Sequence, residues 1–364
     1  MGGENMKQRK QRKIYSYITG LLLAAAFVLC ISGNVPALAA EDMTAVTIDG
    51  IQYNLARKHY AVASIDAVRG ENLNTELYIP DQVEYRGETY KVKLFNWGDK
   101  RKYSNTNYSW KEEVVIPDKE HSYFARLQKI TFAPGVLVKG FCYGYEQLRE
   151  ISVPYPDHLL DAYYNNCPKL ERLYLPAKMS SADIKNCPSL RVTVDPNNKF
   201  IMATEDAIYT RDGQRLYTVY RSAETYRVPE GVRWINVNAF WGDTTIRHLY
   251  LPDSLRDPYM GIDYIVNLES IHFGKKLRSF NFESLTHTRR LRRIDFPKNV
   301  WKIRGTDDQM QCVDKVYIRA KKLHKNTYFS GNTKKFIFYV KNKTVKKQLR
   351  KSGFKGKIVI KKKI

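Results

Sequence analysis

The sequence predicts a mainly β solenoid, in which short coils of chain stack on one another. The first observation is a recurring pattern of an apolar residue, two variable residues, an apolar residue, one variable residue and a further apolar residue. The second is that proline often follows this pattern. Because proline has no N–H to donate to a β-ladder, it belongs at the end of a strand. Each coil would expose an apolar edge that only the next coil covers, so the coils must stack.

The pattern begins at matching residues that are mostly 21 to 23 positions apart, so each coil contains one predicted strand. The starting residues are Leu127, Leu148, Leu170, Ile246, Leu268, Leu291 and Val313, and Leu190 begins a shorter variant. The closing prolines are Pro80, Pro117, Pro154, Pro176, Pro229, Pro252 and Pro297, whereas no proline follows Phe273 or Ile318.

These coils resemble the BspA-type leucine-rich repeats of bacterial surface proteins. In that unit a strand is followed by Pro, Val, Ile, Ala-Phe, Cys and then Leu. The chain matches the unit at 228–235 and 239–240, and it matches the Cys and Leu portion at 166–170 and 186–190. The resemblance extends over about 45–360. It implies a leucine-rich-repeat solenoid with β-hairpin embellishments and a small C-terminal α/β cap.

The chain is predicted to have four segments. Residues 1–40 are a secretory signal peptide, and residues 41–98 form an N-terminal β cap with a first degenerate repeat. Residues 99–332 hold the leucine-rich repeats, with a hairpin insertion near 195–228, and residues 333–364 form a basic C-terminal cap. Tight-turn signals for three hairpins are Asp49-Gly50, Arg86-Gly87 and Arg211-Asp212-Gly213. The polar stretch 99–112 predicts a surface loop.

The C-terminal cap has thirteen Lys or Arg residues and no Asp or Glu. Its apolar residues nevertheless alternate at 336–340 and again at 358–360, with a further apolar group at 345–349. We therefore expect a strand, a short helix and a second strand. The alternative is a disordered basic tail.

The first 40 residues have the order typical of an export signal. A basic start precedes an apolar stretch at 18–31, and an Ala-x-Ala sequence ends near Ala39 or Ala40. This predicts a secreted, extracellular protein, with association with the cell wall as an extension of that location. An uncleaved membrane anchor is the alternative, but the apolar run is shorter than the roughly 20 residues of a spanning helix. We expect no stable membrane span after signal removal.

The charge of the chain favours anionic partners. Loss of residues 1–40 removes five basic residues and Glu4, which lowers the formal net charge from +24 to +20. A charge of this size attracts wall polymers, acidic glycans or membrane surfaces. Export makes nucleic acid the least expected partner. The predicted partners are an extracellular protein or glycan ligand and an anionic cell-wall polymer.

No catalytic constellation is recognised in the sequence. It contains no His-Glu-x-x-His, no Gly-x-Ser-x-Gly and no phosphate-binding loop, so we expect neither an enzyme nor a cofactor. Cys142, Cys167, Cys187 and Cys312 contain no Cys-x-x-Cys pair, and we expect free buried thiols rather than disulfides. His248 and His272 both lie on repeat strands, but in different positions of the repeat, so no metal site is predicted.

The outward-facing side chains of the repeat strands are the candidate ligand-binding residues. Alternate side chains of a strand point to opposite faces, so a residue between two inward apolar positions faces outward. Tyr and Arg on such a face often provide binding energy at interfaces. The candidates are Arg172, Tyr174, His248, Tyr250, His272, Arg293 and Tyr317. Two interpretations stay open for this face, a binding surface and ordinary solubilising decoration.

Two functions follow from these observations. The first is a secreted or cell-surface protein that binds a protein, glycan or cell-surface ligand without catalysis. The alternative is a wall-associated structural protein held on anionic wall polymers by its basic C-terminal cap.

Overall fold

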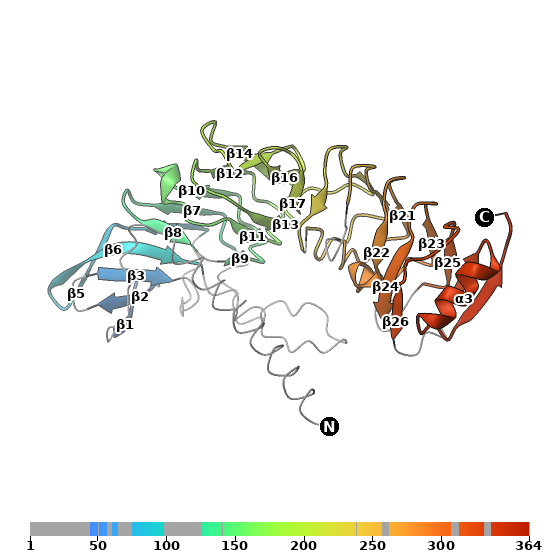
Figure 1. Ribbon diagram of the computed structural model, residues 1–364. Helices are drawn as coiled ribbons and strands as arrows, with labels where there is room; N and C mark the ends of the chain where they lie inside the picture. Colours follow the sequence, from blue (N-terminus) through green and yellow to red (C-terminus); the bar gives the residue numbers. More distant parts are fainter. Residues whose placement is uncertain are drawn as a thin grey trace, which may run out of the picture. The chain divides into compact units, whose positions relative to one another are not determined.

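The computed structural model describes residues 44–49, 51–56, 60–64, 75–97, 126–139, 141–237, 239–256, 262–306, 313–330 and 336–363. The predicted signal peptide, the predicted loop at 99–112 and Cys312 lie outside these ranges. The described chain is mainly β, with a single α-helix, and the predicted solenoid is confirmed (Figure 1). No described helix combines the length and apolar character needed to cross a membrane.

The predicted repeat strands are present and pair in parallel with the strands of neighbouring coils. For example, Ile130 pairs with Ile151, and Ile294 pairs with Val316, so equivalent apolar residues align from coil to coil. The sheets that they form also include β4, β18 and the two predicted cap strands, and their strands in order are β4 (Glu76–Ile79), β7 (Lys129–Phe132), β10 (Glu150–Ser152), β12 (Arg172–Leu175), β14 (Arg191–Val194), β18 (Thr225–Arg227), β20 (His248–Tyr250), β21 (Ser270–His272), β23 (Arg293–Phe296), β25 (Lys315–Ile318), β27 (Ile337–Val340) and β28 (Lys357–Ile360).

Most coils contain a second short strand, which the sequence pattern did not predict. These strands pair in parallel into further sheets, as in the pairing of Tyr164 with Cys142 and Ile184. They have only two to five residues, too few for an apolar period to be recognised in the sequence. The second strands are β9 (Phe141–Tyr143), β11 (Tyr163–Asn165), β13 (Asp183–Lys185), β19 (Trp234–Ile235), β22 (Ser279–Asn281), β24 (Lys302–Thr306) and β26 (Tyr328–Ser330).

One turn type recurs between the two strands of a coil. The N–H of Val300 donates to the carbonyl of Pro297 at 3.1 Å, and Leu277 donates in the same way to Gly274 at 3.2 Å. These i to i+3 bonds define β-turns, whose two central residues project outward while the following Val or Leu is buried. Gly274 stands where other coils have proline. A Cβ there would lie 2.1 Å from the carbonyl oxygen of Pro252, so only glycine fits.

The Asn-Cys-Pro motifs form stacked corners on the second side of the coil. Asn166 and Asn186 have φ angles of 55° and 52°, a left-handed conformation that asparagine tolerates. The Asn186 amide donates to Asn166 Oδ1 at 2.8 Å, which ties one corner to the next. Cys167 and Cys187 lie buried beside these corners. As expected, the described cysteines are free and buried, and the Sγ atoms of Cys142 and Cys167 are 3.7 Å apart.

The N-terminal part and the insertion are built from antiparallel hairpins. The three predicted turns each connect two paired strands, and β15 joins the hairpin of the insertion. Strand β3 pairs in parallel with β6, a pairing that the sequence did not predict. The strands are β1 (Thr44–Ile48), β2 (Ile51–Ala56), β3 (Tyr60–Ser64), β5 (Gln82–Tyr85), β6 (Glu88–Asn96) and β8 (Leu137–Lys139), and in the insertion β15 (Ile201–Ala203), β16 (Ala207–Thr210) and β17 (Arg215–Val219).

The C-terminal segment has the predicted strand, helix and strand. Helix α3 (Lys343–Lys351) crosses between the parallel strands β27 and β28, and the Asn342 side chain caps it by accepting from the N–H of Val345 at 2.9 Å. Val345, Leu349 and Phe354 are buried against the last coils. The segment is thus part of the core. Two short 3₁₀ helices, η1 (Pro156–His158) and η2 (Phe282–Leu285), complete the described elements.

Candidate functional site

The seven predicted binding residues lie in three separate sheets rather than in one continuous row. Arg172 and Tyr174 belong to the β12–β14 sheet, and the two histidines and Tyr250 belong to the β18–β20–β21 sheet. Arg293 and Tyr317 belong to the β23–β25–β27–β28 sheet. The insertion of β15–β17 separates the first sheet from the other two in the chain. We call the outward surface of these sheets the ladder face.

The first sheet presents its candidates to solvent. Tyr174 is 36% exposed, and its hydroxyl donates to Asp195 at 2.8 Å. This bond raises the pKa of Tyr174. The pKa of Asp195 is lowered, mainly by the hydrogen bond that its carboxylate accepts from the Asn197 N–H and secondly by the bond from Tyr174. Arg172 is also exposed, opposite Arg191 in the parallel register. The Tyr174 ring is therefore held in one orientation while its face stays accessible.

In the second sheet, side chains of three successive coils stack on one another. The register aligns Arg227, Tyr250 and His272. The Arg227 guanidinium lies 3.7 Å from the centre of the Tyr250 ring, and the His272 ring stacks on Tyr250 at 4.1 Å with an interplanar angle of 7°. His248, one row away, bonds through Nδ1 to the Ser270 hydroxyl at 2.9 Å. The three side chains form a continuous stack, in which the guanidinium and the rings lie face against face.

The environment of His272 disfavours its charged form. Burial, followed by the positive charges of His248 and Arg227, lowers the pKa of His272 below its ordinary value. The imidazole on the ladder face is therefore neutral over a wider pH range than a solvent-exposed histidine.

In the third sheet the predicted residues are engaged with their neighbours. The Arg293 guanidinium lies 4.2 Å from the centre of the Tyr317 ring, and the Tyr339 ring stacks on the other side at 4.6 Å. Tyr317 is only 9% exposed as a result, although its strand position is outward. Arg293 Nε is also bonded to Asp295 at 2.5 Å, and Arg319 donates to the same carboxylate at 3.0 Å. The expectation that Tyr317 is an accessible binding residue thus does not fit its surroundings.

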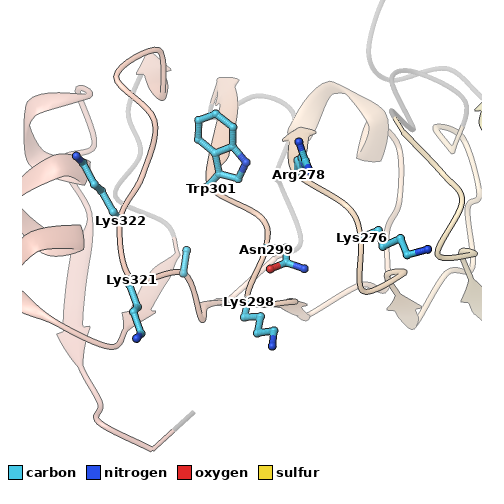
Figure 2. Close-up of a pocket in the computed structure, with 8 residues that line it drawn as sticks. Lys276, Arg278, Lys298, Asn299, Trp301, Lys321 and Lys322 are labelled. Atoms are coloured by element: carbon cyan, nitrogen blue, oxygen red, sulfur yellow. The ribbon is translucent and has the colours of Figure 1, made fainter.

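A second surface, which the sequence analysis did not single out, lies on the turns that leave β21, β23 and β25. Two adjoining hollows of about 380 and 460 Å³ share Trp301 and Lys322, and Figure 2 shows the residues that line the first. We call this surface the turn groove and define it by Lys276, Arg278, Lys298, Trp301, Lys321 and Lys322. All six side chains are exposed. Among the described residues, the lining of both hollows contains no Asp or Glu.

The backbone of the turns fixes the position of Trp301 between Arg278 and His324. Its N–H donates to the carbonyl of Arg278 at 3.0 Å, and the N–H of His324 donates to the carbonyl of Trp301 at 2.7 Å. The three residues therefore occupy equivalent positions in successive coils. The His324 ring meets Trp301 edge-on, with ring centres 4.6 Å apart and an interplanar angle of 73°. Trp301 remains 38% exposed.

The charge of this turn row changes along the chain. In two preceding coils the first central turn residue is acidic: Glu230 Oε1 accepts from the N–H of Asp253 at 2.8 Å, and Asp253 accepts from the N–H of Lys275 at 2.6 Å. In the next three coils the same position is Lys275, Lys298 and Lys321. The sequence contains this switch, but it is visible only when equivalent turns are aligned by their hydrogen bonds.

The described residues do not indicate a metal site or a reactive thiol. Within them, no group of three or more His, Cys, Asp or Glu side chains is placed to hold a metal ion. Cys142 is fully buried, and this burial raises the pKa of its thiol. A reactive cysteine requires an accessible site that lowers the thiol pKa.

No family model matches the chain, and no curated protein matches it. Several solved structures are similar. The pneumococcal vaccine antigen PcpA is 12% identical with a TM-score of 0.43, covering 87% of this chain and 98% of its own. A leucine-rich cell surface protein from Faecalibacterium prausnitzii is 14% identical with a TM-score of 0.36, covering 80% and 96%. A leucine-rich repeat protein from Bacteroides ovatus is 15% identical with a TM-score of 0.36, covering 81% and 70%.

The aligned parallel registers of successive coils make the chain a β-solenoid, and the solved structures to which it is similar include bacterial leucine-rich-repeat proteins.

Proposed function

We propose that the protein is a secreted or cell-surface binding protein whose ladder face holds an extracellular protein or glycan, without catalysis. The observation that carries this proposal is the strip formed by Arg227, Tyr250 and His272, in which each ring or guanidinium lies against the next. Side chains that are fixed before a ligand arrives lose little conformational entropy on binding, so a preformed strip favours affinity. Tyr and Arg are also enriched among the residues that dominate binding energy.

Affinity capture with the full-length chain, against wall fractions, glycans and host extracellular proteins, would identify the ligand. The double variant Tyr174→Ala and Tyr250→Ala is then expected to weaken capture by at least about tenfold. Tyr317→Ala is unsuitable here because the ring is covered by its neighbours. Capture that is unchanged in the double variant, with an unchanged circular dichroism spectrum, would remove the ladder face as the binding surface.

The second candidate function is retention on anionic wall polymer through the basic C-terminal cap. Exposed lysines of this cap support it, because helix α3 and the last residues carry Lys346, Lys347 and Lys361–Lys363 on their solvent side. Deletion of 333–364 is a poor test, since it would also remove the buried side chains of Phe336 and Phe338 and uncover the core of the preceding coil. Replacing these five exposed lysines, Lys346, Lys347 and Lys361–Lys363, by Gln keeps the core. Retention on cells in low salt should then fall, whereas unchanged retention would contradict this function.

A further inference from the structure

We propose that the turn groove is a binding site for an anionic oligosaccharide, carboxylated or sulfated, with one sugar ring lying on Trp301. This site is separate from the ladder face, so the inference does not depend on the proposed function. It rests on the composition of the groove, its dimensions and the exposure of the single tryptophan at its centre.

The charge of the groove requires an anionic ligand. Lys276, Lys298 and Lys321 come from three successive turns, and no carboxylate belongs to the described lining. None of these three cations forms an ion pair with another described residue, in contrast to Arg247 or Arg293 elsewhere on the solenoid. Clustered like charges repel one another, and an anion relieves that repulsion. Arg278 adds a planar fork of donors that suits a carboxylate or sulfate.

The spacing of the groove suits a chain with charges distributed along it. Equivalent residues of neighbouring coils lie roughly 5 Å apart across the strand ladder. That step is comparable to the length of one sugar ring, so the equivalent lysines Lys298 and Lys321 can meet successive anionic sugars, while Lys276 adds a cation from the preceding turn. Each of the two hollows falls within the range of about 300–1,000 Å³ that is typical of small-ligand sites. A short oligosaccharide fits this space, whereas a folded domain does not.

Trp301 supplies the recognition element that charge alone lacks. Its ring is the one aromatic side chain of the hollow lined by Lys276 and Lys298, and Figure 2 shows it beside Arg278 and Lys322. An indole combines a flat apolar face with a polar N–H, which matches a sugar ring that has an apolar C–H face and a polar rim. His324 packs edge-on and limits the motion of the indole.

A single-stranded nucleic acid is the competing ligand for a basic groove with an aromatic residue. Such ligands use successive aromatic platforms, one for each stacked base. In this row the equivalents of Trp301 are Arg278 on one side and His324 on the other, and His324 already packs against the indole. One platform beside Arg278 and the groove lysines fits one ring that carries anionic groups, which favours the acidic sugar.

The experiment measures binding of the full-length chain to fluorescent oligosaccharides by titration at several salt concentrations. The probes are an oligogalacturonate with carboxylates only, a heparin-derived tetrasaccharide with sulfates, and a neutral maltotetraose. A single-stranded oligonucleotide and inorganic polyphosphate are the competing polyanions. We expect both acidic oligosaccharides to bind, the neutral sugar not to bind, and affinity to fall as salt rises. The relative affinities of the two acidic probes distinguish a carboxylated from a sulfated ligand.

The variants separate stacking from charge. Trp301→Ala is expected to weaken acidic oligosaccharide binding about tenfold, whereas Trp301→Phe should retain most of it. The double variant Lys298→Glu and Lys321→Glu should weaken binding by more than about tenfold. The matched control, Lys178→Glu and Lys199→Glu, makes the same charge change at exposed lysines away from the groove and should have little effect. The five-lysine Gln variant of the C-terminal cap should likewise bind normally.

Several results would overturn the proposal. Binding of polyphosphate as tight as that of the oligosaccharides, with no effect of Trp301→Ala, would show attraction by charge alone. Tighter binding of the oligonucleotide that depends on Trp301 would assign the groove to nucleic acid. Equal losses in the groove double variant and in its matched control would show that net charge, rather than the groove, determines binding.

Discussion

The β23–β25 part of the ladder face and the turn groove contain the same types of side chain, but only on β23–β25 do acidic and basic groups neutralise one another. On the ladder face, Arg293 is bonded to Asp295 and lies on the ring of Tyr317, which is 9% exposed. In the groove, Trp301 is 38% exposed and the described lining provides no carboxylate. Aromatic and basic side chains that satisfy one another stabilise the stack of coils. Those that lack such partners remain available to a ligand.

This difference depends on which residue type occupies a given position in each coil. Asp295 lies two residues after Arg293 on β23 and also accepts from Arg319 of the next coil, so one carboxylate neutralises both cations. The turn position instead changes from Glu230 and Asp253 to lysine in the later coils, so neighbouring turns there add like charges. The solenoid thus repeats its backbone faithfully while its surface chemistry varies from one coil to the next.

The largest expected effect tests whether the ladder-face rings are structural. Tyr317→Ala removes a buried ring that contacts both Arg293 and Tyr339, so the free energy of unfolding should fall by about 2–4 kcal/mol. Trp301→Ala should cost no more than about half of that, because much of the indole already faces solvent. Urea denaturation of both variants measures the two values. A larger loss for Trp301→Ala would reverse the comparison between the two surfaces.

Adding a carboxylate to the turn groove, or removing one from the ladder face, is expected to change binding or stability by an intermediate amount. Asn299→Asp places a carboxylate in the turn groove and should weaken acidic oligosaccharide binding several-fold, by about 1 kcal/mol. Its stability should fall slightly, since the exposed Asn299 amide donates to the carbonyl of Lys275 at 2.7 Å, a bond that a carboxylate cannot make. Asp295→Asn on the ladder face releases Arg293 and Arg319 from their shared carboxylate. It should lower the free energy of unfolding by about 1 kcal/mol and leave binding in the groove unchanged.

Isothermal titration calorimetry of both variants beside the parent chain measures the change in binding, with Asn299→Gln as the uncharged control. Urea denaturation measures the change in the free energy of unfolding. If Asn299→Gln weakened binding as much as Asn299→Asp, shape rather than charge would determine affinity at this position.

The smallest expected effect concerns pH on the ladder face. The pKa of His272 is lowered by burial and by nearby positive charge, so its neutral form is favoured in the folded chain. An unfolded histidine has a pKa of about 6.5. The resulting stability is fully present above that pH and is lost as the pH falls through the lowered folded value. NMR titration of the ring should show the low midpoint, and Arg227→Gln should raise it. A midpoint that Arg227→Gln leaves in place would remove the electrostatic part of this explanation.

The sequence by itself determined the repeat. Leu148, Leu170, Leu268 and Leu291 are all fully buried at matching positions, because an apolar residue recurring once per coil has only the shared core to enter. The hairpin turns and the C-terminal strand, helix and strand were also predictable, because their signals are local in the chain. Such features depend on which residues follow one another within a few positions.

Only the tertiary structure decided which side chains meet across coils. Tyr317 is covered by residues 24 positions before it and 22 after it, and the turn groove collects side chains from turns roughly one repeat apart. A sequence period indicates which face a residue occupies. It does not fix the register of one coil on the next, and this register decides whether a cation finds a carboxylate, a ring or open solvent.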